Sequence, residues 1–372
     1  MSKIGRKKFL KQLTIAGATG GLALACDTDK KQVVNQPNII TEKKYKWYMV
    51  TTWPPNFPVI GTACNRFADK VREMSNGQLD IRVYGGNELI PPLEVFDAVS
   101  SGTSHLGHGA SYYWTGKVQS AQFFTTVPMG LNALEQTTWI NHGGGMQLWR
   151  DIYDRFNLIP FVSGNTALQM GGWFNREINS VDDFKSLKMR IPGLAGKILK
   201  DLGATPVLVA GGEIYTNLER GVLDATEWLG PYHDRLMGFH RIAKYYYTPG
   251  WHEPGSTLEM IVNKEAYQSL PKHLQTILEV ANGYLNDWMT TEMLYRNAQS
   301  YHELMNESNL EIRQFNDDIL DSLRQKTDEI LDQMAAEDGE IKKVYDSFLD
   351  FKKQMKAYSS ISEKLYYNKI NS

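Results

Sequence analysis

Apolar and polar positions change their spacing repeatedly along the chain, which predicts strands and helices in alternation. Residues 79–84 alternate apolar and polar side chains, as a half-buried strand does, whereas residues 61–74 carry apolar side chains at helical steps. Alternation of this kind favours an α/β fold with a mostly parallel sheet. The same reasoning predicts a helix at 93–99 and strands at 46–53, 159–162, 187–191, 207–210 and 258–262.

The last third of the chain follows a different pattern, since only residues 310–315 have the pattern of a strand there. Residues 271–307 and 317–356 carry apolar side chains at three- and four-residue steps, which predicts long helices. An apolar helical face has to be covered, either by the rest of the same chain, as a brace, or by a second subunit. The spacing leaves both alternatives open.

The chain is long enough for more than one compact body. Its 372 residues exceed the size of one small core and suit two lobes. The content of 42% hydrophobic and 22% charged residues is that of a globular protein, not of a disordered or fibrous one. Beyond the first 26 residues, no apolar stretch is long enough to span a bilayer.

The first 26 residues have the composition of an export signal. A basic start without acidic residues precedes the apolar stretch 13–25, which ends in Ala23-Leu24-Ala25. The run GRKKFLK at 5–11 resembles a twin-arginine signal, although Lys7 stands where the second arginine is usual. Export by the general route is therefore the alternative.

Cys26 follows this segment and has two interpretations. It is either the lipidated first residue of a mature lipoprotein or simply the residue after a signal-peptidase cut. We favour lipidation, because an exported protein has little other use for a cysteine at that point. The polar residues 27–44 are expected to form a flexible tether. The other cysteine, Cys64, is expected to be a small buried side chain on a helix.

The net charge argues against one class of partner. Removal of residues 1–26 leaves 35 of the 40 Lys and Arg residues against 42 Asp and Glu residues, a formal charge of −7. A protein with this charge is not expected to bind nucleic acid. A small anion remains compatible with it, because a buried site can be locally positive.

Common catalytic and nucleotide-binding signatures do not occur in the sequence. It contains no G-x-S-x-G, H-E-x-x-H, G-x-x-x-x-G-K or G-x-G-x-x-G motif. His105 and His108 could share a metal ion if they lay on a helix, but the glycines around them favour a strand or a turn. We therefore expect both to be structural histidines.

Four segments place polar and aromatic residues where predicted strands end. Arg190 ends a predicted strand just before Pro192 and Gly193, where a helix is expected to begin. A guanidinium there can grip a carboxylate with two parallel hydrogen bonds, and the helix N-terminus adds a favourable field. Spacing alone would favour a surface arginine. The segments are 111–114 (SYYW), 165–174 (NTALQMGGWF), 181–193 (VDDFKSLKMRIPG) and 223–232 (LDATEWLGPY).

At these segments the chain resembles the periplasmic binding subunits of tripartite ATP-independent periplasmic (TRAP) transporters, the DctP-like family. SVDDFKSLKMRIPG is the most diagnostic stretch, and QMGGWFN, EWLGPYHD and YYYTPGWHEPG are similar to the 2-oxoacid-binding branch of that family. The resemblance runs from about residue 47 to about residue 315. It implies an α/β, two-lobed periplasmic binding protein fold with a ligand cleft between the lobes and a long helical C-terminal tail.

The resemblance also implies roles for individual residues. Arg190 matches the arginine that binds the ligand carboxylate in the family. The side-chain oxygens of Gln169 and Glu227 and the backbone carbonyl of Trp228 match the groups that hold a cation, which also contacts the ligand. Hard oxygen ligands suit Na⁺ or Ca²⁺ and not zinc. A cation would also relieve the repulsion between Glu227 and an anionic ligand.

The remaining expected contacts involve a carboxylate and several aromatic residues. Glu253 matches a family position near the ligand and could accept a hydrogen bond from it. Tyr112 and Tyr113 are adjacent, and the sequence does not decide which of them points inward. Other aromatic residues that could either wall a small-ligand cleft or pack in the core are Trp114, Trp173, Trp228 and Trp251.

The implied organisation has five parts: a signal peptide (1–26), a tether (27–44), a first lobe (45–165 with about 255–306), a second lobe (166–254) and a helical tail (307–372). The tail is similar in kind to the C-terminal helix with which members of the 2-oxoacid-binding branch embrace a second subunit. A homodimer is therefore expected, with the brace as the alternative.

The predicted function is the capture of a 2-oxo or 2-hydroxy monocarboxylate, such as pyruvate, a branched 2-oxoacid or lactate, together with Na⁺ or Ca²⁺. The protein would act in the periplasm, anchored by lipid at Cys26, and deliver its ligand to the permease subunits of a TRAP transporter. One alternative is a dicarboxylate or sugar acid, which needs a second cationic anchor; Arg176 and Lys197 have no matching role. The others are a metal-assisted enzyme acting on such acids and a two-component sensor input.

Overall fold

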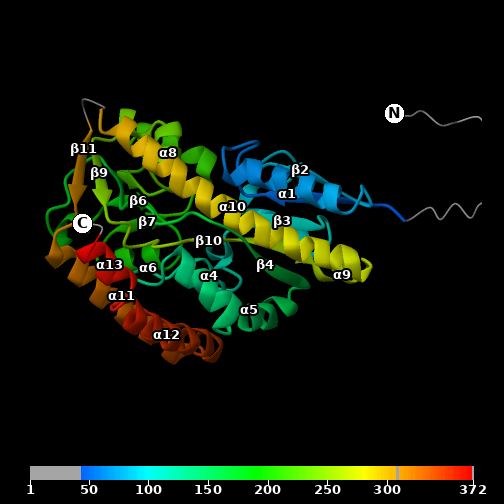
Figure 1. The fold of residues 1–372 in the computed structure, drawn as a ribbon. Helices are drawn as coiled ribbons and strands as arrows, with labels where there is room; N and C mark the ends of the chain where they lie inside the picture. Colours follow the sequence, from blue (N-terminus) through cyan, green and yellow to red (C-terminus); the bar gives the residue numbers. More distant parts are fainter. Residues whose placement is uncertain (1–42, 307–309, 371–372) are drawn as a thin grey trace, which may run out of the picture. The chain divides into compact units, whose positions relative to one another are not determined.

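The computed structural model describes residues 43–306 and 310–370, which form two β-sheets with helices packed around them (Figure 1). The first sheet has the strand order β2-β1-β3-β10-β4, and the second has the order β11-β9-β5-β8-β6-β7. Each sheet with its helices forms one lobe, as the two-lobed α/β fold requires. The predicted signal peptide, Cys26 and most of the predicted tether lie outside the described residues.

The predicted strands lie close to their positions in the structure, but the strands at 106–109, 172–174, 225–226 and 245–248 were not predicted. The strands of the first sheet are β1 (Tyr45–Thr51), β2 (Leu79–Tyr84), β3 (Leu106–Gly109), β4 (Leu158–Asn165) and β10 (Thr257–Asn263). The strands of the second sheet are β5 (Gly172–Phe174), β6 (Lys188–Arg190), β7 (Thr205–Val207), β8 (Ala225–Thr226), β9 (Tyr245–Thr248) and β11 (Glu311–Gln314). The strand predicted at 207–210 is shifted, because the chain pairs with β6 only from Thr205 to Val207.

Both sheets are mixed, which corrects the expectation of a mostly parallel sheet. In the first sheet β1 runs parallel to β2 and β3, but β10 runs antiparallel to β3 and β4. In the second sheet β5 runs antiparallel to β8 and β9. The reason lies in the connections. The chain leaves the first sheet at Asn165 and returns beside it at Thr257, and strands that leave and return at one end of a sheet pair antiparallel.

The two connections that follow β4 and precede β10 lie side by side at the junction of the lobes. The backbone N–H of Gln169 donates to the carbonyl oxygen of Glu253 at 3.2 Å. Gly250 approaches the other connection so closely that a Cβ there would lie 2.2 Å from the carbonyl oxygen of Gln169, so only glycine fits. The paired connections therefore carry two predicted site residues to one place.

Helices cover both lobes, and α10 (Lys272–Leu304) connects them. It packs against β4 and α1 of the first lobe and against α8 of the second. Its buried stripe includes Leu278, Leu285 and Met289, and full burial of one such side chain contributes roughly 1.5–3 kcal/mol. The shorter helices are α1 (Ile60–Met74), α2 (Val95–Ser100), α3 (Gln122–Thr125), α4 (Ala133–His142), α5 (Gly145–Asp154), α6 (Gly193–Asp201), α7 (Ile214–Glu219), α8 (Pro231–Leu236) and α9 (Lys264–Gln268).

The tail that follows contains two long helices where the sequence predicted one helical stretch. α11 (Asp317–Glu337) ends at Asp338, whose backbone is extended and whose side chain caps α12 (Gly339–Ser359). The carboxylate of Asp338 accepts hydrogen bonds from the N–H groups of Glu340 at 2.7 Å and Ile341 at 3.1 Å. Aspartate is a strong N-cap, which explains the break. A short helix, α13 (Glu363–Lys369), ends the described chain.

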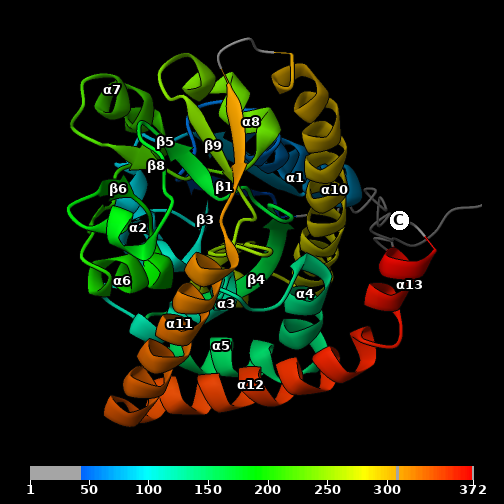
Figure 2. The ribbon, with the colours of Figure 1, turned by 90° about the vertical axis from the view of Figure 1, so that its left-hand side faces the viewer.

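The chain's own lobes cover the apolar face of α11 and α12. α11 packs against α6 of the second lobe, whereas α12 packs against α4 and α5 of the first and runs beneath α5 in Figure 2. Phe348 of α12 lies edge-on to Trp139 of α4, with ring centroids 5.3 Å apart. The tail thus braces both lobes, which is one of the two arrangements that the spacing left open.

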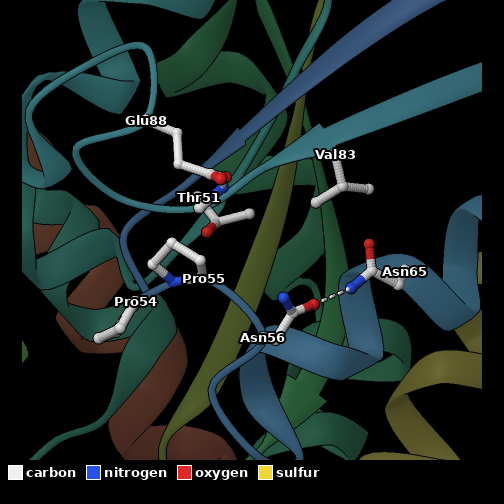
Figure 3. Close-up of a pocket in the computed structure, with 9 residues that line it drawn as sticks. Thr51, Pro54, Pro55, Asn56, Asn65, Val83 and Glu88 are labelled. Atoms are coloured by element: carbon white, nitrogen blue, oxygen red, sulfur yellow. Dashed lines mark hydrogen bonds between the residues drawn. The ribbon is translucent and has the colours of Figure 1, made fainter.

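The loop after β1 lies at the boundary between the lobes. Phe57 stacks on His233 of α8, with ring centroids 5.3 Å apart, and the Nε2 atom of His233 lies 2.8 Å from the carbonyl oxygen of Pro58. Beside this loop is a pocket of about 110 Å³, shown in Figure 3. Thr51, Pro54, Asn56, Asn65, Val83 and Glu88 line it, and none of the predicted ligand-binding residues does.

Several smaller expectations from the sequence are met. Cys64 is buried in α1, and burial raises the pKa of its thiol. His108 has a structural role, since its Nδ1 accepts a hydrogen bond from the indole of Trp53 at 2.7 Å and its Nε2 lies 2.9 Å from the carbonyl oxygen of Ser163. In the part of the chain that the structure describes, no helix combines the length and apolar character needed to cross a membrane.

Candidate ligand-binding site

Arg190 is the last residue of β6, and its side chain is buried with an exposed fraction of 1%. β6 lies between β7 and β8, so Arg190 is held in register with Val207 on one side and Thr226 on the other. Pro192 follows as the N-cap of α6, which begins at Gly193. The predicted position of Arg190, at a strand end before a helix, is confirmed.

The guanidinium of Arg190 forms a buried ion pair with Glu227. Its Nη1 atom bonds Oε1 of Glu227 and also donates to the carbonyl oxygen of that residue at 3.4 Å. Its Nη2 atom donates to the Tyr113 hydroxyl at 3.5 Å, and its carbon lies 5.1 Å from the centroid of the Trp228 ring. The Nε atom has no hydrogen-bond partner. One edge of the guanidinium therefore remains free for another acceptor.

The charge of Arg190 persists despite its burial. Burial lowers the pKa of Arg190, but the negative charge of Glu227, together with Tyr113, Tyr112 and Glu253, raises it by more. The net pKa lies above the usual value, so the guanidinium stays protonated. A buried charge of this kind has to be balanced by an opposite charge, and Glu227 supplies it.

Glu227 stands directly after β8 and is fully buried. Its backbone N–H donates to the carbonyl oxygen of Arg190 at 3.2 Å, so the ends of two neighbouring strands place the two side chains together. The Oε2 atom of Glu227 has no hydrogen-bond partner and lies 3.4 Å from Nε2 of His252. Neither ring nitrogen of His252, another fully buried residue, has a hydrogen-bond partner. Glu227 therefore keeps one oxygen available for a further positive group.

Gln169 and Glu253 face each other from the two connections between the lobes. The Nε2 atom of Gln169 donates to Oε2 of Glu253 at 2.5 Å and to the Thr166 hydroxyl at 3.2 Å. The Ser256 hydroxyl bonds to the same oxygen of Glu253. Burial, and after it the negative charge of Glu227, raises the pKa of Glu253 to about 7. These bonds orient the amide of Gln169 so that its Oε1 atom is left buried without a partner.

These residues fit a hard cation. Buried polar atoms are almost always hydrogen-bonded, so the unpartnered oxygens of Gln169 and Glu227 mark a place for a positive group. In addition, one ligand atom from each of Glu227, His252 and Glu253 lies within 4.8 Å of the others. Amide and carboxylate oxygens are the ligands that Na⁺ and Ca²⁺ prefer. We refer to Arg190, Gln169, Glu227, His252 and Glu253 as the recognition cluster.

The structure separates the two adjacent tyrosines. The Tyr113 hydroxyl meets Arg190, whereas Tyr112 packs edge-on against the Tyr113 ring, with centroids 4.9 Å apart. A Cβ at Gly193 would lie 3.2 Å from Cβ of Tyr112, which places this tyrosine against the start of α6. Tyr113 is therefore the one that bonds to the cluster, and Tyr112 supports it from behind.

Glu259 anchors the short 3₁₀ helix Ser111–Trp114 that carries both tyrosines. This fully buried carboxylate in β10 accepts hydrogen bonds from the Trp114 indole and, at 3.0 Å, from the Tyr153 hydroxyl. Sequence reasoning missed Glu259, because a single acidic residue in a predicted strand is equally compatible with a solvent-facing position.

Asp234 of α8 holds the segment that carries Glu227 and Trp228. Four donors converge on its buried carboxylate, and burial raises the pKa of Asp234 to about 6. Sequence reasoning missed this role, although an aspartate in the first turn of a helix after Gly-Pro is a signal for such capping. The donors are the N–H groups of Leu229 and Gly230, each at 3.1 Å, the Trp173 indole at 2.9 Å and the Tyr246 hydroxyl at 2.7 Å.

The tryptophans divide between the site and the core. Trp228 lies over the guanidinium of Arg190, and a Cβ at Gly211 would come within 2.3 Å of its ring, so glycine is needed there. Trp173 stacks on Tyr246 at 4.0 Å between ring centroids and belongs to the core of the second lobe. Trp114 and Trp251 are likewise buried in the core, so only Trp228 contacts the ion pair.

Comparison with known proteins identifies the class to which this fold and site belong. The bacterial extracellular solute-binding proteins of family 7 (DctP) match residues 49–338. The chain belongs to this family, and the resemblance noted in the sequence is confirmed. A monocarboxylate 2-oxoacid-binding periplasmic protein of Nostoc sp. is 38% identical over 366 residues, which cover 98% of each chain.

Solved structures of TRAP periplasmic solute-binding proteins are also similar, and they confirm the fold class. The protein from Colwellia psychrerythraea, with bound calcium and pyruvate, is 46% identical at a TM-score of 0.86 and covers 88% of this chain and 99% of its own. The protein from Pseudoalteromonas atlantica, with bound sodium and pyruvate, is 44% identical at a TM-score of 0.86 and covers 88% and 100%. A third, from Bordetella bronchiseptica, is a dimer with calcium and picolinate in one site; it is 32% identical at a TM-score of 0.86 and covers 88% and 97%.

Proposed function

We propose that this TRAP solute-binding protein captures a 2-oxo or 2-hydroxy monocarboxylate, such as pyruvate, together with Na⁺ or Ca²⁺. The observation that carries the proposal is the ion pair of Arg190 and Glu227, whose side chains are 1% and 0% exposed. Similar proteins with bound pyruvate hold calcium in one case and sodium in another, which supports the same pairing of anion and cation here.

Binding exchanges the partners of this ion pair. The ligand carboxylate takes the guanidinium of Arg190, which can grip it with two parallel hydrogen bonds. The cation takes Oε2 of Glu227 and Oε1 of Gln169, the two buried oxygens without partners, and the backbone carbonyl of Trp228. When an anion and a cation bind together, Arg190 faces the anion and Glu227 faces the cation. Every buried charge then has a partner of opposite sign, as a stable buried site requires.

The ligand reaches the cluster only when the lobes move apart. Arg190, Glu227 and His252 are inaccessible to solvent, and the loop that carries Phe57 and Pro58 closes on α8. We infer a hinge at the paired connections of residues 166–171 and 249–256, between the lobes proposed from the sequence. Hinge motion at such connections is the usual closing mode of two-lobed binding proteins.

A monocarboxylate is favoured over a dicarboxylate or sugar acid. A second carboxylate would need a second cationic anchor, and among the described residues Arg190 is the only Arg or Lys that is buried. The guanidinium of Arg176 is exposed and bonds instead to the carbonyl oxygens of Asp183 and Lys185. Lys197 is exposed on α6.

Transport, and not catalysis, is the proposed role. Native mass spectrometry of the purified protein, before and after mild unfolding, is expected to show a bound 2-oxo or 2-hydroxy acid that is released unchanged. Pyruvate that was chemically altered after incubation with the protein would instead support a metal-assisted enzyme. Loss of pyruvate uptake on deletion of the gene would separate transport from sensing.

The proposed place of action is the periplasm, where family members bind their solutes. We further propose that the mature chain starts at Cys26, carries lipid there and hands its ligand to the permease subunits of a TRAP transporter. Mass spectrometry of the membrane fraction tests the anchor, because a diacylglyceryl group would add its mass to the first peptide. An unmodified Cys26 would contradict the anchor and leave the binding function untouched.

A further inference from the structure

A groove between α5 and α10 lies outside the recognition cluster. It has a volume of about 280 Å³, and α4, α5, β4 and α10 contribute its walls. This size is close to the lower end of the range of small-molecule sites, about 300–1,000 Å³. No member of the cluster lines the groove. The lining residues used in the argument are Arg150, Phe161, Glu279, Asn282 and Asn286.

The α10 wall of the groove presents two buried amide oxygens without donors, beside the carboxylate of Glu279. Glu279, Asn282 and Asn286 share one face of the helix, since residues three and four apart are neighbours. The Nδ2 atom of Asn282 donates to the carbonyl oxygen of Leu278 at 2.8 Å, which fixes its amide and leaves Oδ1 buried without a partner. Oδ1 of Asn286 is likewise buried and unpartnered. Asn282 is only 2% exposed, so this deficit is unusual for a folded protein.

The opposite wall presents a cation. Arg150 on α5 is exposed, and its guanidinium carbon lies 5.8 Å from the centroid of the Phe161 ring. Among the described residues, no carboxylate forms an ion pair with Arg150. Glu279 stands at the α10 rim, where it accepts a hydrogen bond from the Tyr267 hydroxyl at 2.7 Å. The groove is therefore lined by a cation on α5, by oxygen acceptors on α10 and by the Phe161 ring of β4.

We propose that this groove is a second ligand site, which takes a small zwitterion of the α-amino-acid class. The carboxylate of the ligand pairs with Arg150, and its ammonium donates to the amide oxygens of Asn282 and Asn286 and faces Glu279. The apolar part of the ligand lies on Phe161. A plain anion would leave the amide oxygens without donors, and a neutral sugar would leave Arg150 without a counter-charge.

The test is isothermal titration calorimetry on the protein saturated with pyruvate and calcium. The probes are free L-amino acids, with acetate and ethylamine as probes for each end alone and glucose as a neutral probe. At least one amino acid is expected to bind saturably, and acetate and ethylamine at least about tenfold more weakly, because each lacks one charge-assisted contact. No saturable amino-acid binding, or glucose binding of equal strength, would overturn the proposal.

Variants assign the binding to the groove. Arg150→Gln and Asn282→Leu are each expected to weaken amino-acid binding about tenfold or more, because each removes a contact to one end of the ligand. Arg82→Gln is the matched control, since Arg82 is also exposed and lies over a ring, that of Tyr84 at 4.9 Å, outside the groove. Arg150 is at the surface, so its loss does not threaten folding.

A further variant separates the groove from the cleft. Arg190→Ala, which disables the recognition cluster, is expected to leave amino-acid binding unchanged. If amino-acid binding disappears in Arg190→Ala and survives in Arg150→Gln, the amino acid binds in the cleft and the proposed second site is wrong.

Discussion

Arg190 and Glu227 are brought together by the backbone before their side chains meet. The two residues lie at the ends of β6 and β8, and the N–H of Glu227 donates to the carbonyl oxygen of Arg190 at 3.2 Å. The side chains form an ion pair without solvent, in which each charge is balanced chiefly by the other. A ligand carboxylate that arrives together with a cation gives Arg190 and Glu227 each a new partner of opposite charge.

Replacement of Arg190 is expected to weaken pyruvate binding strongly. Arg190→Ala removes a buried charge-assisted contact and should lose roughly 3 kcal/mol or more of affinity. Arg190→Lys should recover only part, because an ammonium cannot make two parallel bonds to a carboxylate. Calorimetric titration with pyruvate measures both. Arg176→Ala is the control, since that guanidinium bonds only to backbone carbonyls away from the cluster. Unchanged affinity in Arg190→Ala would contradict the proposed role.

Removal of cations is expected to lower the affinity for pyruvate. Without a cation, Glu227 repels the ligand carboxylate, and the buried Oε1 atom of Gln169 stays without a partner. The measurement is calorimetry on metal-free protein in a buffer with a bulky organic cation, with Na⁺ or Ca²⁺ then added back. Glu227→Gln should abolish the response to added ions, whereas the exposed Glu88→Gln should retain it. Binding that is indifferent to every ion tested would rule the cation out.

The Glu227→Gln variant is also expected to be less stable than the unaltered protein. The substitution leaves Arg190 buried without its ion-pair partner, which typically costs 3–5 kcal/mol, so a loss of roughly that size is expected. Urea unfolding of the ligand-free protein measures it, with Glu88→Gln as the matched control. A stability equal to that of the unaltered protein would show that Arg190 is not balanced by Glu227 alone.

Closure of the lobes is expected to make the protein more compact. Small-angle scattering should give a smaller radius of gyration with pyruvate and calcium than without them. Phe57→Ala should shift the balance toward the open form, because it removes the ring contact with His233, an aromatic pair of a kind worth about 0.5–1.5 kcal/mol. The exposed Leu89→Ala is the control. An unchanged radius on saturation would reject the hinge.

Much of the fold could be predicted because the spacing of apolar residues is a local property. Residues 79–84 alternate and form β2, and the helical spacing of 61–74 matches α1 (Ile60–Met74). The direction of β10 could not be predicted, since it depends on the place where the chain returns to the first sheet. For the same reason the break at Asp338 was missed, because a cap is recognised only once the helix boundary is known.

Part of the site could also be predicted from local patterns in the sequence. Arg190 ends β6 and Glu227 follows β8, so a shared sheet edge places them close together. Their mutual ion pair was not predicted, since the resemblance to the family assigned Arg190 to the ligand and Glu227 to the cation. His252 was missed because its role depends on a contact with a distant segment of the chain, and Asp234 because two of its donors, the Trp173 indole and the Tyr246 hydroxyl, come from other strands.

The buried carboxylate in β10 predicts a pH-dependent stability. Burial raises the pKa of Glu259 to about 7 from its ordinary value of 4.5. The folded protein therefore holds this proton more tightly than the unfolded chain does, and folding stability falls as the pH rises from about 4.5 through 7. The loss amounts to about 3 kcal/mol at higher pH. Urea unfolding over this pH range should show a steeper decline in the unaltered protein than in Glu259→Gln, because the variant keeps the raised pKa values of Glu253 and Asp234. If the free energy of unfolding changed with pH in the same way in both proteins, the prediction would be wrong.

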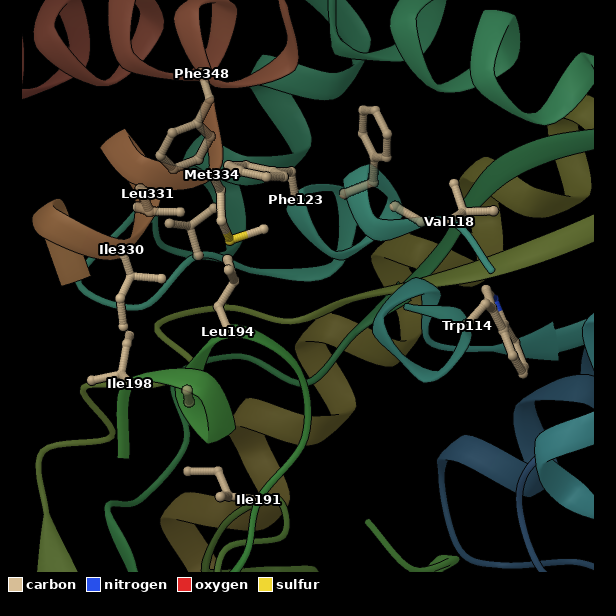
Figure 4. Packing of buried hydrophobic residues seen from close by; sticks show 14 of the residues in the cluster. Trp114, Val118, Phe123, Ile191, Leu194, Ile198, Ile330, Leu331, Met334 and Phe348 are labelled. Carbon is tan, nitrogen blue, oxygen red and sulfur yellow. The ribbon is translucent and has the colours of Figure 1, made fainter. Parts of the chain in front are cut away.

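The end of the tail leaves large apolar side chains exposed. Ile361 is 73% exposed and Ile370 is 74% exposed, in contrast to the buried faces of α11 and α12. In Figure 4, Ile330 of α11 faces Ile198 of α6, in line with the packing of these two helices. A second subunit would therefore bind at residues 358–370 and not at the braced part of the tail. The exposed set is Tyr358, Ile361, Leu365, Tyr366, Tyr367 and Ile370.

A homodimer through this exposed set is expected, because clustered apolar surface of this kind marks an interface. Light scattering should give a mass near two chains at micromolar concentration. A chain that ends at Ser359 keeps α11 and α12 on the lobes and should have a mass near one chain, whereas a cut after Phe315 would also expose the apolar surface of α6 and could not separate the two effects. Ile361→Ser with Tyr367→Ser is the milder variant and should weaken the dimer without loss of pyruvate binding. A mass near one chain for the intact protein would refute the dimer and leave the tail as a brace alone.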